Sequence, residues 1–88
     1  MDDIQLIQTL DRYRAKLGAK AIQAQKVTAP GNHTQLETLQ HVLYMMDQIE
    51  VLLQSGEQEK LMRWLGFAQG VLWAQGIYTL DELKDHNR

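Results

Sequence analysis

The chain contains no cysteine and only one serine, Ser55, in 88 residues. The absence of cysteine excludes disulfide bonds and metal sites built from thiolates. Ser55 stands between two helical patterns, so it is better explained as a helix cap than as a nucleophile. Gly66 and Gly70 lie inside a helical pattern and lack the Lys-Ser/Thr of a phosphate-binding loop. The sequence therefore predicts a protein that is not an enzyme and uses no cofactor.

A long apolar run and a basic amino terminus are also missing. The segment from Leu61 to Ile77 is the most apolar, but Arg63 and two glutamines interrupt it, and it is too short to span a bilayer comfortably. Met1 is followed by two aspartates, where a secretory signal would be basic. We expect a cytoplasmic protein without a membrane segment. The net charge of −2 neither favours nor excludes nucleic acid as a partner.

Strand-like alternation is absent, and apolar residues recur at helical spacing along most of the chain. The only proline, Pro30, marks the clearest break between helical patterns. Thr34-Gln-Leu-Glu37 and Thr79-Leu-Asp-Glu82 have the form of capping boxes, which open helices. Gly76 suits the left-handed conformation that follows a helix end. These signals predict a single all-α domain over residues 1–88, with helices at roughly 3–27, 34–54, 56–75 and 79–86.

The predicted architecture is a small helical bundle. Two long helices form an antiparallel hairpin, a third apolar helix packs against it, and a short helix follows at the C-terminal end. In the second helix, the main apolar stripe passes through Leu36 and Leu43 and leaves Met45 and Leu52 to one side, so this helix can contact more than one neighbour. The predicted core contains Leu10, Leu17, Leu39, Leu43, Met46, Leu61, Leu65 and Leu72.

One ion pair is predicted inside the hairpin. Arg14 lies at the edge of the first apolar stripe, and Glu50 lies within the second. If the connecting loop centres near Gly31, the two side chains reach about the same level. We therefore predict a partly buried Arg14–Glu50 pair, of a kind that is costly to break when it is fully buried. In the alternative, both side chains extend to solvent.

Basic and acidic residues are separated along the chain. Residues 12–26 carry Lys and Arg without acids, whereas residues 27–59 carry acids without Lys or Arg. Arg12, Lys16 and Lys20 recur at spacing four on the first helix and could follow phosphates, so nucleic-acid binding is the alternative function. No aromatic residue lies among them to stack on bases, and the isoelectric point of about 5.8 is unlike that of a dedicated nucleic-acid binder.

Histidines and carboxylates are too scattered to predict a metal site. Glu37 and His41 share a helical face, while His33 lies in the preceding loop and His86 near the C-terminal end. A metal site needs three or more converging ligands. We therefore expect a solvent-exposed Glu37–His41 pair and no bound metal.

The third helix is the most informative part of the sequence, because it is apolar on nearly every side. Gly66, Gly70 and Ala74 recur at spacing four and form a stripe where another backbone can approach closely. The stripe is explained either by close packing inside the chain or by a partner. Tryptophan and methionine beside it are typical of interface centres. We predict a homodimer whose interface contains Met62, Gly66, Phe67, Gly70, Trp73 and Ala74.

The stretch from Met62 to Arg88, which begins Met-Arg-Trp-Leu-Gly-Phe-Ala-Gln-Gly-Val-Leu-Trp, resembles the C-terminal part of small uncharacterised proteins of tailed bacteriophages and prophages. The resemblance covers about the last third of the chain. It implies an accessory protein made in the cytoplasm of an infected bacterium, which acts by binding a host or phage protein. No activity is assigned to that family, so the resemblance gives no residue a role.

Overall fold

The computed structural model describes residues 1–88 and is entirely helical. Its four helices are α1 (Asp3–Gly18), α2 (Gln35–Gln54), α3 (Gln58–Ala74) and α4 (Leu80–His86). The prediction of a small all-α bundle is confirmed. None of the helices is long and apolar enough to cross a lipid bilayer.

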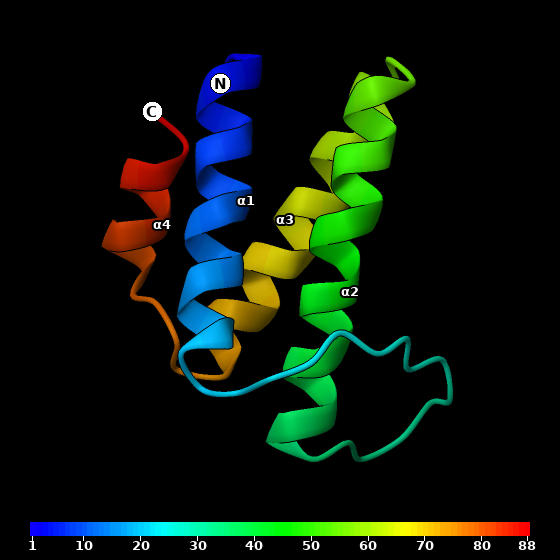
Figure 1. Cartoon of the computed structure of the whole chain (residues 1–88). Coiled ribbons are helices and arrows are strands. Elements are labelled where there is room, and N and C mark those ends of the chain that lie inside the picture. Colours follow the sequence, from blue (N-terminus) through cyan, green and yellow to red (C-terminus); the bar gives the residue numbers. More distant parts are fainter.

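The helices alternate in direction along the chain (Figure 1). α1 and α2 run antiparallel, α3 returns alongside α2, and α4 runs back beside α1. The N- and C-termini therefore lie at the same end of the molecule, where the Gln5 side-chain amide donates to the Arg88 carbonyl. α2 packs against both α1 and α3.

Three helices begin with a complete capping box, in which a side chain and a backbone N–H bond reciprocally. Both boxes predicted from the sequence are present. The Glu37 N–H donates to Thr34 Oγ1 at 3.1 Å in α2, and the Glu82 N–H donates to Thr79 Oγ1 at 3.1 Å in α4. A third box, formed by Asp2 and Gln5, opens α1. Because each box depends on residues three apart, two of them could be recognised without knowledge of the fold.

The predicted first helix, 3–27, is too long, because α1 ends at Gly18. The Ile22 N–H donates to the Leu17 carbonyl at 3.2 Å, and the Ala21 N–H donates to the Gly18 carbonyl at 2.9 Å. This closing pattern requires a left-handed residue, and Ala21 takes that position with φ +58°. The turn lets Ile22 fold back into the core beside Leu17. Residues 23–34 then cross to α2 without regular structure.

Seven of the eight predicted core residues are buried. Leu43 is the exception, because it is only partly buried at the edge of the core. The predicted α2 stripe is wrong at Leu36, which is exposed, whereas Met45 and Leu52 beside the stripe are buried, as a second neighbour of this helix requires. The reason is that α2 packs against α1 and α3 together, so two directions of the helix are covered rather than one stripe.

α3 ends as predicted. Gly76 has φ +73°, and the Ile77 N–H donates to the Leu72 carbonyl at 2.9 Å. α3 begins at Gln58, two residues after the predicted start. Ser55 caps the end of α2 rather than the start of α3, with its hydroxyl donating to the Leu52 carbonyl at 3.2 Å.

Candidate interaction surface

All six predicted interface residues lie on the solvent-facing side of α3. Its three large apolar side chains are about half exposed: Phe67 at 59%, Trp73 at 53% and Met62 at 47%. Gly66, Gly70 and Ala74 lie between them. At about 100° per residue, Met62 and Trp73 border one side of this small-residue stripe and Phe67 borders the other. We call these six residues the α3 face.

The glycines of the α3 face are not required by packing within the chain. A methyl group added at Gly66 or Gly70 would meet no other atom within 4 Å. The alternative in which α3 is a central helix crossed closely at its glycines is therefore wrong. α2 packs against α3, and the buried apolar residues of α3 lie on the side opposite the α3 face: Leu61, Leu65, Ala68 and Leu72.

The α3 face continues onto α4. A shallow hollow between the two helices is lined by Gly70 and Trp73 from α3 and by Leu80 and Leu83 from α4. Leu80 is 55% exposed, while Leu83 is buried beneath it. The exposed apolar area therefore extends beyond the six residues that the sequence pattern identified.

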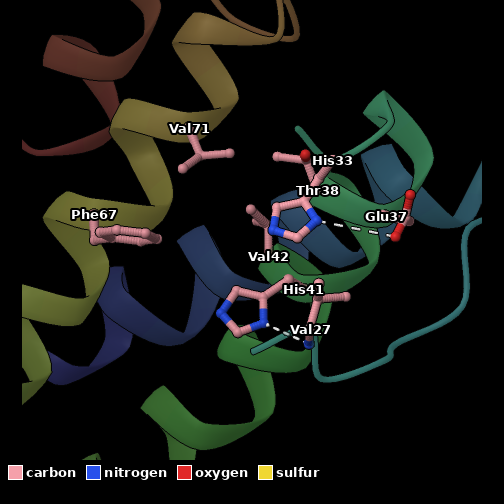
Figure 2. A pocket seen from close by; sticks show the side chains of 8 residues that line it. All are labelled: Val27, His33, Glu37, Thr38, His41, Val42, Phe67 and Val71. Carbon is pink, nitrogen blue, oxygen red and sulfur yellow. Dashed lines mark hydrogen bonds and ion pairs between the residues drawn. The ribbon is translucent and has the colours of Figure 1, made fainter. Parts of the chain in front are cut away.

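On the other border, Phe67 lies at the mouth of a hollow of about 190 Å³ between α2, α3 and the segment before α2 (Figure 2). Val27, Val42 and Val71 form its apolar lining, and His33 and His41 lie on its α2 side. Binding pockets for small molecules and cofactors usually exceed about 300 Å³. The hollow is therefore better matched to one side chain of another protein.

The polar groups of this hollow bond within the chain. His41 Nδ1 accepts the Val27 N–H at 3.1 Å, and His33 Nδ1 lies 4.0 Å from Glu37 (Figure 2). The predicted Glu37–His41 pair is therefore wrong. The segment before α2 folds over that helix, and its Val27 N–H bonds His41 in place of Glu37. Burial, with His33 and Lys26 nearby, lowers the pKa of His41. No group of three or more potential metal ligands converges anywhere in the structure.

The predicted ion pair is present. Arg14 lies 3.3 Å from the Glu50 carboxylate, and both side chains are partly exposed. Two carboxylates that the prediction did not include also contact Arg14: Asp47 at 3.0 Å and Asp11 at 3.3 Å. Burial opposes the charge on Arg14, but the bonds to Asp47 and Glu50 outweigh it and raise its pKa. The cluster joins α1 to α2.

The basic residues of α1 are exposed, as their spacing predicted, but two of them have neighbours in the fold. The Lys16 amine lies 5.4 Å from the centre of the Tyr78 ring. Arg12 lines a small polar hollow with Asp85 and His86 of α4. Lys20 lies in the turn after α1. Of the three basic residues predicted to follow phosphates along one helix, only Arg12 and Lys16 therefore lie on α1.

A buried polar cluster escaped the sequence analysis. Gln69 Nε2 donates to the Tyr13 hydroxyl at 2.9 Å and to Asn87 Oδ1 at 2.8 Å. The Tyr13 hydroxyl also bonds His86 Nδ1 at 2.9 Å. In the sequence, Gln69 stands only as an interruption of an apolar segment. Its spacing from Leu65 and Leu72, on the side of α3 that faces the core, was the available signal.

The candidate surface consists of apolar and small side chains with one guanidinium, Arg63, in their midst. Such a surface can bury area against another protein. Comparison of the chain with protein-family models, curated proteins and solved structures found no match.

Proposed function

We propose that this protein is a non-enzymatic accessory protein that works by protein–protein interaction, as a homodimer joined through the α3 face. The observation that carries the proposal is the joint exposure of Met62, Phe67 and Trp73 around a stripe of small residues. Scattered exposed apolar residues are normal, but contiguous ones on one helix are typical of interaction sites.

A second copy of the chain is the simplest occupant, because a two-fold axis makes one surface complementary to itself. An antiparallel pair of α3 helices centred between Gly66 and Gly70 brings Gly66 opposite the partner's Gly70. The same pairing sets Met62 beside the partner's Trp73. Contacts between a thioether and an aromatic ring contribute about 0.3–1.5 kcal/mol each, and the symmetry forms this contact twice.

The hollow beside Phe67 would take a side chain of a further protein, because its lining residue Val71 lies beyond Phe67 on α3, away from the small-residue stripe. Its size fits one apolar side chain, and its two histidines offer a polar rim. The phage resemblance of residues 62–88 supports a host or phage protein in the bacterial cytoplasm as that second partner. This part of the proposal depends on the hollow and not on the dimer.

Molar mass in solution tests the dimer. Light scattering behind size exclusion, at about 50 and about 200 mM salt, should give a mass of two chains at both concentrations, because apolar contacts respond little to salt. A mass of one chain up to the highest soluble concentration would refute the homodimer.

Nucleic-acid binding through Arg12, Lys16 and Lys20 remains the alternative, supported by the exposure of all three side chains. The contacts of Lys16 with Tyr78 and of Arg12 with the α4 hollow favour the protein-binding proposal instead. A fluorescent single-stranded DNA of mixed sequence distinguishes the two. Binding at about 50 mM salt that weakens more than tenfold by about 200 mM would support the alternative, because phosphate contacts are strongly salt-dependent.

A further inference from the structure

The polar cluster between α1, α3 and α4 has a feature that packing alone does not require. α4 has only seven residues, and a helix of that length is not stable in isolation. Its attachment depends on Leu83 and on the contacts of His86 and Asn87 with Tyr13 and Gln69. A change in these polar contacts therefore acts directly on whether α4 stays docked.

The polar side chains of the cluster form a continuous chain of hydrogen bonds from Asn87 to His86. Both Gln69 Nε2 hydrogens are donated, one to the Tyr13 hydroxyl and one to Asn87 Oδ1. Asn87 Nδ2 returns a bond to Gln69 Oε1 at 3.2 Å. The Tyr13 hydroxyl accepts from Gln69, and its own hydrogen bonds His86 Nδ1 in the tautomer of His86 that carries its hydrogen on Nε2. His86 must be unprotonated at Nδ1 to accept it.

We propose that this cluster is an acid-sensitive latch, in which protonation of His86 at Nδ1 opposes the Tyr13 hydroxyl with a second donor and releases α4 from the bundle. The hydrogen bonds could be rebuilt around a protonated ring only if the Gln69 and Asn87 amides both turned over. His86 is also partly buried, so its charged form would lose part of its hydration. The latch is independent of the proposed dimer.

The charges around His86 agree with this direction. Burial and Arg12 of α1 lower the pKa of His86, while Glu82 and Asp85 of α4 act in the opposite sense. Lys16 of α1 lies over the neighbouring Tyr78 ring, and Arg88 pairs with Asp85 at 3.0 Å. α3 presents no charged group here, only Gln69.

Tyr13 is not the group whose protonation changes in the latch. Burial raises its pKa, and the bond from Gln69 only partly offsets this, so its hydroxyl stays protonated from acid to neutral pH. His86 is therefore the group in the cluster whose protonation changes near neutral pH. Because its pKa is lower in the folded chain than in the unfolded chain, the stability it contributes is complete above about pH 6.5 and is lost as the pH falls.

NMR on the labelled full chain tests the latch. The Cα chemical shifts of residues 80–86 report the helicity of α4, and the ring shifts of His86 report its protonation. We expect the two to change with the same midpoint below about pH 6.5, with α1, α2 and α3 unchanged. The docking equilibrium of α4 should fall roughly fivefold to tenfold, as expected for the loss of one hydrogen bond. If the His86 ring titrates while the α4 shifts stay constant, the proposal is refuted.

Four variants show which residue causes the pH-dependent change of the α4 shifts. The variants His33→Gln and His41→Gln should keep the pH-dependent change of the α4 shifts, since both side chains bond elsewhere. His86→Gln should abolish it, leaving the α4 shifts independent of pH. If that variant releases α4 outright, Tyr13→Phe decides the matter, because it keeps His86 and removes only the hydroxyl. An α4 response in Tyr13→Phe as large as in the wild type would overturn the latch.

Discussion

Replacing Ala21 by glycine should stabilise the protein. The φ of +58° at Ala21 places a Cβ in the left-handed region, which costs roughly 1–2 kcal/mol for a residue other than glycine. Glycine removes this cost but adds conformational entropy to the unfolded chain, worth about 0.4–1 kcal/mol. The expected net gain is about 0.5–1 kcal/mol. For a domain of this size, that gain raises the melting temperature by roughly 2–8 °C.

Thermal and urea unfolding followed by circular dichroism measure the effect. Ala19→Gly is the matched control, because Ala19 lies two residues earlier at a helical φ of −62°. There glycine brings the entropy cost without relief of strain, so stability should fall by about 0.5–1 kcal/mol. Opposite signs at the two positions support the early end of α1. If Ala21→Gly destabilises the protein as Ala19→Gly does, α1 continues toward residue 27 and the described turn is wrong.

Three further experiments test the core, the ion pair and a cap, each by urea unfolding. Leu65→Ala should cost about 2–5 kcal/mol because the side chain is buried, whereas Val51→Ala on the exposed side of α2 should change stability by less than about 0.5 kcal/mol. A double-mutant cycle on Arg14 and Glu50 should give a coupling of about 0.5–1 kcal/mol that shrinks in high salt; additive effects would contradict the pair. Thr79→Ala should cost about 1 kcal/mol, and no change would mean that the α4 cap adds nothing.

Local signals were sufficient for the predicted fold class and for most helix ends. The threonine capping boxes and the positive-φ glycine at Gly76 act over three or four residues, so the sequence contains the whole interaction. The end of α1 has no such signal, because alanine at position 21 is the strongest helix former. Its turn is stabilised by burial of Ile22 in a core formed by other helices, which no local pattern reveals.

Only part of the candidate site, likewise, could be predicted from the sequence. The exposed α3 face was predictable because a helical wheel assigns small and large side chains to directions. The sequence alone did not decide whether another part of the chain covers that face, and the structure shows open space over Gly66 and Gly70. The cluster of Tyr13, Gln69 and His86 joins residues up to 73 apart in sequence, so it emerges only when α4 returns beside α1.

The dimer through the α3 face is tested most directly by sedimentation equilibrium of Gly70→Leu beside Gly18→Leu. Both glycines have open space around them and a φ that leucine can adopt, so both variants should remain folded, with Gly70→Leu gaining up to about 1 kcal/mol of helix propensity. We predict that Gly70→Leu loses dimerisation by at least about tenfold, because its side chain blocks the close approach of the partner helix, while Gly18→Leu dimerises like the wild type. Equal dimerisation by all three proteins would contradict the α3 face as the interface.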